Sequence, residues 1–184
     1  DNQIYRYTGT IQGGALYAAS CSGFLDGVRF AGNASRNGYG AVSQNSEGGA
    51  MYASGGAWQI SNSVFRANQA VKTQNEVYLN RGGAVLLNGG THFIFNSIFA
   101  GNTALGSGSA IRVEGAAAKL AIVNTTVAGN TGGGALDVVA GTVAVTNSLF
   151  WQNEGDIAGT VALGNSLTQD GYAVGLDGNI SADP

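Results

Sequence analysis

The sequence predicts an all-β fold, a right-handed parallel β-helix (β-solenoid) of about six coils with three short strands in each coil. Two recurring elements support this prediction. A Gly-Gly-Ala element or a close variant ends at Ala15, Ala50, Ala84, Ala110 and Ala135. A Phe-x-x-Asn element, with Val127 once in the Phe place, ends at Asn33, Asn68, Asn102, Asn130 and Asn153. Units that repeat in this way bury their apolar faces by stacking on their neighbours, as in solenoids.

The composition fits a chain with many tight corners. Of the 184 residues, 31 are Gly and one is Pro, and the hydrophobic share of 44% excludes a disordered chain. Gly and Asn both tolerate the left-handed backbone that such corners need. The net charge is −3 and lysine occurs only at Lys72 and Lys119, so no nucleic-acid partner is expected.

Other features also restrict the class of protein. Cys21 is the only cysteine, which rules out an intrachain disulfide and a multi-cysteine zinc site, and we expect it to be buried. No apolar run approaches the roughly 20 residues of a membrane helix, so no membrane span is expected in this chain. The chain begins with Asp1 and is expected to be a piece of a longer, secreted precursor.

Apolar residues alternate with variable ones in each expected strand, as they do when one side of a strand is buried. The first strand points inward with Leu16, Met51, Val85, Ile111 and Leu136. Its next residues, expected to face outward, are Tyr17, Tyr52, Leu86, Arg112 and Asp137. The second strand points inward with Ile60, Ile94, Ile122 and Val145, preceded by Trp58, His92, Leu120 and Val143. The third points inward with Phe30, Phe65, Phe99, Val127 and Phe150.

We expect one domain over residues 1–184, with an entry segment at 1–10, coils at 11–167 and a turn-rich tail at 168–184. The recurring alanines are spaced 35, 34, 26 and 25 residues apart. The longer early coils carry insertions at Ala34–Glu47 and Gln69–Arg81, on the kind of edge where solenoids often bind ligands. They are equally well explained as tolerated decoration, because doubling a loop costs only about 0.6 kcal/mol. Neither end of the repeat shows a recognisable cap.

The repeat resembles that of polymorphic outer-membrane proteins, found in autotransporter-type passengers. The matching residues are Gly13–Leu16, Gly48–Met51, Gly82–Val85 and Gly133–Leu136, with Phe30–Asn33, Phe65–Asn68, Phe99–Asn102 and Phe150–Asn153. The segment Gly178–Pro184 is similar to the Gly-Asn-Ile-x-Ala-Asp-Pro segment of secreted bacterial β-helix proteins, including those with a "choice-of-anchor" C-terminus. The resemblance implies an extracellular or cell-surface setting and an adhesive or structural role.

No catalytic or metal site emerges from the residues. A polysaccharide-degrading β-helix needs two or three carboxylates stacked on one outer face, or carboxylates together with Arg or Lys and often calcium. Asp137 shares its column with Arg112, Leu86 and tyrosines, so the acidic residues do not stack. Asp170, Asp177 and Asn179 carry oxygen ligands for calcium, but their spacing fits neither an EF-hand nor the Gly-Gly-x-Gly-x-Asp nonapeptide. His92 is the only histidine and is expected to be a core residue beside Trp58 and Leu120. Two columns of asparagines recur, those of the Phe-x-x-Asn element and the corner residues Asn62, Asn96, Asn124 and Asn147. Both are expected to stack along inward corners, with their side-chain amides bonded to one another.

Two surfaces are candidates for binding. Clustered tyrosines form platforms for sugars or proteins, and the candidate ligand surface comprises Tyr17, Tyr52, Tyr39, Tyr78, Arg36 and Arg81. Apolar residues that point outward are usually covered by something. The candidate assembly surface comprises Phe93, Phe95, Val64, Ile98 and Leu149.

We therefore expect a non-enzymatic extracellular structural or adhesive protein, without a cofactor, that binds a host surface or glycan, itself, or both. Self-association would proceed head to tail into a filament, because open β-helix ends can template another strand. The alternative is a carbohydrate-binding or polysaccharide-degrading β-helix protein. Detectable turnover, or filaments in the electron microscope, would distinguish these classes.

Overall fold

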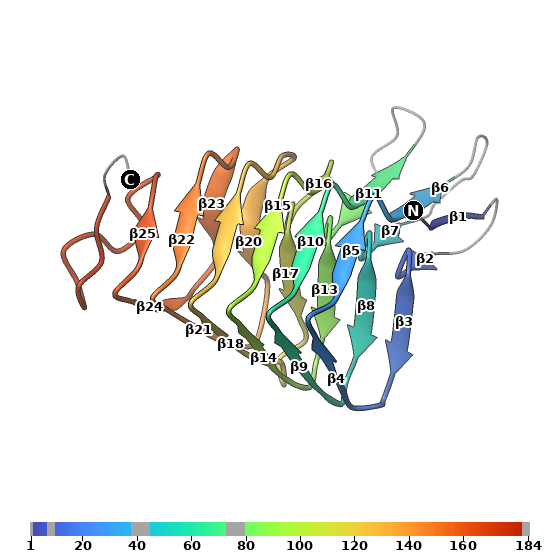
Figure 1. Ribbon diagram of the computed structural model, residues 1–184, viewed down its shortest axis with the longest axis horizontal. Helices are drawn as coiled ribbons and strands as arrows, with labels where there is room; N and C mark the ends of the chain where they lie inside the picture. The colour runs from blue at the N-terminus through green and yellow to red at the C-terminus, as the bar shows by residue number, and fades with distance from the viewer. Residues whose placement is uncertain (1, 7–9, 38–44, 73–79, 182–184) are drawn as a thin grey trace.

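The chain folds as a right-handed parallel β-helix of six coils, as predicted (Figure 1). The computed structural model describes residues 2–6, 10–37, 45–72 and 80–181. Over these residues the regular structure consists of β-strands, and all strand pairs are parallel. The described ranges contain no helix that is long and apolar enough to cross a membrane.

Three six-stranded sheets form the three sides of the solenoid, and the successive coils follow one another along its axis (Figure 1). Sheet I consists of β3 (Leu16–Ala19), β8 (Met51–Ser54), β13 (Val85–Asn88), β17 (Ile111–Glu114), β20 (Gly134–Val138) and β23 (Gly155–Ala158). Sheet II consists of β4 (Gly23–Asp26), β9 (Ala57–Ser61), β14 (Thr91–Phe95), β18 (Lys119–Val123), β21 (Thr142–Thr146) and β24 (Ala162–Gly164). Sheet III consists of β5 (Arg29–Ala31), β10 (Val64–Arg66), β15 (Ile98–Ala100), β19 (Thr126–Ala128), β22 (Leu149–Trp151) and β25 (Leu167–Thr168).

The insertions of the early coils begin and end with paired strands, which sequence reasoning described only as loops. Sheet IV consists of β1 (Gln3–Arg6), β6 (Ala34–Asn37), β11 (Gln69–Lys72) and β16 (Thr103–Ala104). Sheet V consists of β2 (Ile11–Gln12), β7 (Ser46–Glu47) and β12 (Asn80–Arg81). The entry segment therefore contributes β1 to a sheet. Sheets IV and V lie at the N-terminal end of the solenoid (Figure 1).

The predicted inward columns are confirmed. In sheet I, Met51, Val85, Ile111 and Leu136 lie in register on neighbouring strands and are fully buried. In sheet III the rings of Phe65 and Phe99 stack with centroids 4.6 Å apart and planes within 3°. The first members of these columns, Leu16 and Phe30, are only half-buried because no coil covers their N-terminal side among the described residues.

The two glycines of the Gly-Gly-Ala element are required for different reasons. The first glycine takes a left-handed conformation, as Gly82 does with φ of +64°. In the first three coils the second glycine has no room for a side chain, since a Cβ on Gly83 would lie 2.1 Å from the backbone oxygen of Ser109 in the next coil. The fourth coil has Ser109 itself at this place. Gly49 is equally confined by the oxygen of Gly83, at 2.0 Å. The element therefore marks a corner where consecutive coils touch through their backbones.

The Phe-x-x-Asn asparagines form a buried ladder. Asn68 donates from its backbone N and from Nδ2 to Oδ1 of Asn102, both at 3.0 Å. Its Nδ2 also donates to the backbone oxygen of Phe30, at 3.0 Å. The same contacts recur from Asn33 to Asn153, which satisfies the polar groups of a corner that is otherwise closed to water.

The prediction for the other asparagine column was wrong. Asn62, Asn96, Asn124, Asn147 and Asn165 are exposed rather than inward, and each has φ near +50°. Their amides bond one another only weakly, at 3.3 Å from Asn124 to Asn96 and 3.5 Å from Asn96 to Asn62. These residues share a left-handed backbone conformation at a corner, which Asn tolerates better than most residues. Cys21, expected to be buried, is also exposed.

The C-terminal end has a cap that the sequence did not reveal. Tyr172 and Ala173 of the tail pack against the end of the hydrophobic core. The Tyr172 hydroxyl accepts a hydrogen bond from the backbone N of Val161 at 3.0 Å and donates to the oxygen of Gly159 at 3.1 Å. At another corner, the backbone N of Ser148 donates to Oγ of Ser166, and Asn179 continues this column by accepting from the backbone N of Ser166, at 3.1 Å. The tail thus covers a core end that we had expected to be open.

Candidate functional site

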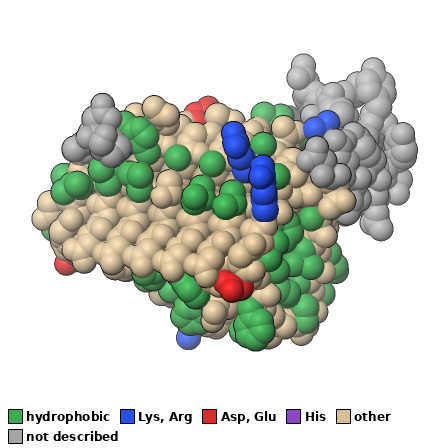
Figure 2. Space-filling view, in the orientation of Figure 1, with side chains coloured by type: hydrophobic (Ala, Val, Ile, Leu, Met, Phe, Trp, Pro, Cys, Tyr) green, Lys and Arg blue, Asp and Glu red, His purple; other side chains and the backbone are tan. Residues whose placement is uncertain are grey.

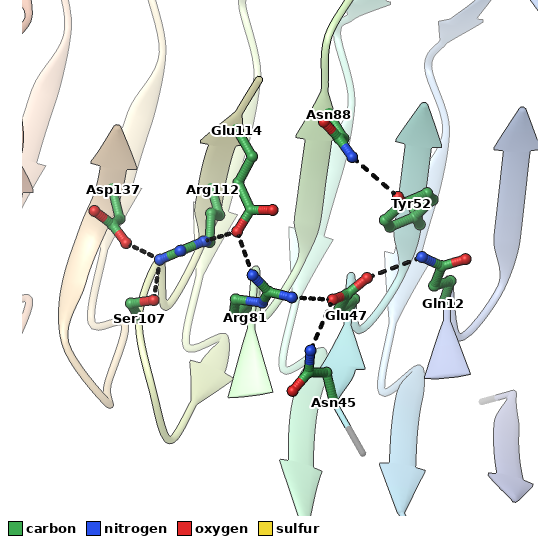
Figure 3. Close-up of polar contacts among 10 residues, drawn as sticks. All are labelled: Gln12, Asn45, Glu47, Tyr52, Arg81, Asn88, Ser107, Arg112, Glu114 and Asp137. Carbon is green, nitrogen blue, oxygen red and sulfur yellow. Dashed lines mark hydrogen bonds and ion pairs between the residues drawn. The ribbon is translucent and has the colours of Figure 1, made fainter. Parts of the chain in front are cut away.

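A chain of alternating charges runs from sheet V onto the outer face of sheet I. From the N-terminal coil onward, the chain runs Glu47, Arg81, Glu114, Arg112 and Asp137 (Figure 3). Arg81 donates to Glu114 at 2.8 Å and also contacts Glu47. Arg112 contacts both Glu114 and Asp137. Each of the three carboxylates therefore has a guanidinium partner, and an extended network of this kind contributes more than isolated surface pairs do.

Sheet V and this network also bury residues that were expected to face outward. The strand β12 ends beside sheet I because the chain turns sharply at Gly82. A Cβ added to Gly82 would lie 2.9 Å from Cβ of Leu86. As a result Leu86, Tyr52 and Arg112 are buried, although their column was predicted to be exposed. The prediction failed because the alternation along a strand shows only which side chains point away from the core. It does not show whether a neighbouring sheet covers those side chains from outside.

Two of the candidate tyrosines are brought together. The rings of Tyr17 and Tyr52 are stacked with centroids 5.6 Å apart and an angle of 13° between them. Tyr17 is 56% exposed, whereas Tyr52 is 5% exposed, and its hydroxyl accepts a hydrogen bond from Asn88 at 3.4 Å (Figure 3). Burial raises the pKa of the Tyr52 phenol further above its ordinary value. Tyr17 therefore presents an aromatic surface supported by a fixed second ring.

The other members of the candidate ligand surface are scattered or undescribed. Arg81 lies in the charge network on the same face as Tyr52 (Figure 3). Arg36 is in sheet IV, where it donates to Oε1 of Gln69 at 2.8 Å. Tyr39 and Tyr78 lie outside the described residues. Sequence reasoning overlooked Glu47 and Glu114, although the shared column of Arg112 and Asp137 already indicated an ion pair.

Two of the remaining acidic residues, Asp156 and Asp170, each accept a hydrogen bond from the other's backbone N. Asp156 is 1% exposed, and burial raises the pKa of its carboxyl. It accepts hydrogen bonds from Nδ2 of Asn153, at 2.9 Å, and from the backbone of the tail, while Asp170 accepts from the backbone N of Asp156, at 3.0 Å. These contacts fasten the tail to the last coils. Among the described residues, no group of three His, Cys, Asp or Glu side chains is placed to hold a metal ion.

His92 is a core residue, as predicted. It is 2% exposed, it lies in register with Trp58 and Leu120, and its Nε2 is 2.7 Å from the backbone oxygen of Gly89. Burial lowers the pKa of the imidazole, and the contact with Gly89 opposes this only in part. The buried histidine is therefore neutral in the folded chain near pH 7.

This burial predicts a pH dependence of stability. Because the folded pKa of His92 is lowered, the unfolded chain binds more protons as the pH falls below about 6.5, and folding loses stability there. The variant His92→Leu should lack this contribution, because leucine does not titrate. Leucine should fit the site, since Leu120 already occupies the next place in the column. The melting temperature should fall more between pH 7.5 and pH 5 in the parent chain than in His92→Leu. Equal falls would contradict the prediction.

The outer face of sheet II carries a shallow groove of about 430 Å³. Phe24 and Phe93 stand on either side of Gln59, and Gly23 exposes the edge of Trp58 beneath them. Phe24 is 79% exposed and Phe93 is 50% exposed. Phe24 was overlooked in the sequence, although its register with Gln59 and Phe93 was available from the repeat.

The candidate assembly surface is divided between two faces. Phe93 and the half-buried Phe95 lie on sheet II. Ile98 is 43% exposed on sheet III, where Val64 and Leu149 are half-buried. The face seen in Figure 2, which lies over sheet III, carries few charged side chains.

Comparisons with protein-family models, with curated proteins and with solved structures found no match.

Proposed function

We propose that this chain is a non-enzymatic structural and adhesive module of an extracellular or cell-surface protein. The observation that carries the proposal is the pairing of Glu47, Glu114 and Asp137, the three carboxylates of the charge network, with Arg81 or Arg112. A glycoside hydrolase needs two carboxyl groups free to act on the substrate as acid, base or nucleophile. Here the carboxylates instead hold neighbouring coils together.

The resemblance of the repeat to polymorphic outer-membrane proteins supports the cellular setting. It rests on the Gly-Gly-Ala and Phe-x-x-Asn elements, whose roles at the backbone corner and in the asparagine ladder are architectural. A regular rod whose corner asparagines are hydrogen-bonded from coil to coil suits a stalk or passenger that must stay folded outside the cell.

The adhesive contact is assigned to the exposed ring of Tyr17 and the charge network beside it. A tyrosine ring offers a flat apolar face to a sugar or to a protein side chain. On the same face, Gln12 donates from Nε2 to Glu47 at 2.9 Å, and Arg81 bonds Glu47 in turn, so a polar surface whose groups are fixed by bonds to one another adjoins the exposed ring (Figure 3). A host-surface glycan is the partner with this combination of chemistry.

Binding of the purified chain to immobilised glycans and to host-cell surfaces tests this assignment. Tyr17→Ala should weaken binding by roughly tenfold, as the loss of an aromatic anchor does. Ile98→Ala, which removes a similarly exposed apolar side chain on sheet III, serves as the matched control and should bind like the parent. Equal affinities of the two variants would contradict the Tyr17 assignment.

A polysaccharide-degrading enzyme is the alternative function. Incubation with pectic, alginate and other uronic-acid polymers, with and without calcium, is expected to release no new chain ends. Turnover that disappears in Asp137→Asn would overturn the non-enzymatic proposal. Head-to-tail growth into a filament is a further candidate, but the tail would first have to leave the core end that Tyr172 and Ala173 cover.

A further inference from the structure

The outward column in the middle of sheet II has an unusual order of sizes. Its members lie in register on six neighbouring strands, and they are Phe24, Gln59, Phe93, Ala121, Ala144 and Ala162. The three N-terminal members are large and the three C-terminal members are alanines. This face is therefore raised over its first three coils and flat over its last three.

Such a face is complementary to an inverted copy of itself. A twofold axis parallel to the strands, placed between β14 and β18, brings Phe93 opposite the partner's Ala121. It brings Gln59 opposite the partner's Ala144, and Phe24 opposite the partner's Ala162. We propose that sheet II is an interaction surface on which two copies of this chain pair side by side in antiparallel orientation.

The flanking columns agree with this arrangement. On one side, Phe95 meets the partner's Val123, and Ser61 meets the partner's Thr146, so apolar faces apolar and polar faces polar. The two charged residues of the face meet no charge directly opposite. Asp26 faces the partner's Gly164, and Lys119 faces the partner's Thr91 at the margin, where its stem can extend to solvent.

The opposite pairing, with both copies pointing the same way, fails on shape. It would place Phe24 against the partner's Phe24 and Phe93 against the partner's Phe93, while the alanines of the last three coils would be held apart. Close packing of the whole face is then impossible. The size order therefore selects the antiparallel pair. Because a twofold pair is self-complementary and closes on itself, it yields a dimer and not a filament.

The size of the face sets the expected strength. Six strands about 4.8 Å apart and five residues at about 3.3 Å cover about 29 by 17 Å, or roughly 480 Å² on each copy. A stable standard interface buries about 800 Å² on each partner. The dimer is therefore expected to form reversibly at micromolar and higher concentrations, and its surface is separate from the Tyr17 face of sheet I.

Sedimentation equilibrium from about 1 μM to 1 mM tests the pairing. Phe93→Ala removes a large side chain that packs on the partner's Ala121. Ala121→Phe places a second large side chain opposite the partner's Phe93, so the two would clash. Each change should weaken dimerisation by roughly tenfold. Both positions are on the surface, so the variants should remain folded, which circular dichroism can verify. The double variant restores a large residue opposite a small one and should return within about threefold of the parent. Ile98→Ala on sheet III should have no effect.

Cross-linking tests the orientation. In a Cys21→Ser background, Gln59→Cys chains are mixed with Ala144→Cys chains and oxidised. Antiparallel pairs place residue 59 opposite the partner's residue 144, so disulfides should join the two different chains. A parent chain that remains monomeric up to about 1 mM, or disulfides formed mainly between identical chains, would overturn the proposal.

Discussion

Gly83→Ala is expected to destabilise the solenoid by about 4 kcal/mol or more, enough to prevent folding of the chain under ordinary conditions. The added Cβ would lie 2.1 Å from the backbone oxygen of Ser109 and 2.7 Å from the backbone of Thr103. These atoms belong to the next coil and to the neighbouring corner, so no flexible side chain can move away. Relief requires separating whole coils, which breaks parallel hydrogen bonds. Urea denaturation of the purified variant measures the loss.

Gly155→Ala is the matched control for this prediction. Its added Cβ would come no closer than 3.7 Å to Gly134, which is an ordinary contact, and its backbone is not left-handed. It should change the free energy of unfolding by less than about 1 kcal/mol. If Gly83→Ala were as stable as Gly155→Ala, the close approach of coils at the Gly-Gly-Ala corner would be wrong.

Phe99→Ala should cost about 3–5 kcal/mol, the usual range for removing a buried aromatic ring. Phe99 is fully buried between the stacked ring of Phe65 and the side chain of Val127. Neither neighbouring coil can collapse into the space, because the strand spacing is held by backbone hydrogen bonds. Thermal or urea unfolding of the variant, monitored by circular dichroism, gives the value.

Phe93→Ala is the comparison for Phe99→Ala. The ring of Phe93 is 50% exposed on the outer face of sheet II, only six residues away in the sequence. At concentrations where the chain is monomeric, its loss should cost about 1 kcal/mol or less. Similar losses for the two variants would contradict the inward assignment of the Phe-x-x-Asn aromatics.

The sequence was sufficient to predict the fold and its register, because each coil repeats the same requirements. A solenoid places equivalent residues above one another, so the repeat gives both the strand pairing and the inward side. His92 could thus be assigned to the core beside Trp58 from the alignment of the repeats. The aromatic and aliphatic columns followed in the same way.

The candidate site was less predictable, because it depends on contacts between different sheets. Tyr52 and Leu86 leave the core as expected, yet a turn at Gly82 brings a further sheet and its charged side chains over them. A one-dimensional alternation contains no information about such a cover. The cap by Tyr172 was missed for a similar reason, since the tail has no period to align.

The shortening of the coils has a mechanical consequence. The bonded asparagines are separated by 35, 34, 28 and then 23 residues, and the bonded serines Ser148 and Ser166 by 18. Each coil contacts only its neighbours, so a pulling force can peel them from an end one by one. At about 3.4 Å per extended residue, the last coil releases about 60 Å of chain and the first about 120 Å. A force that peels the module from its C-terminal end therefore meets steps of increasing length, and each further step absorbs more extension than the one before.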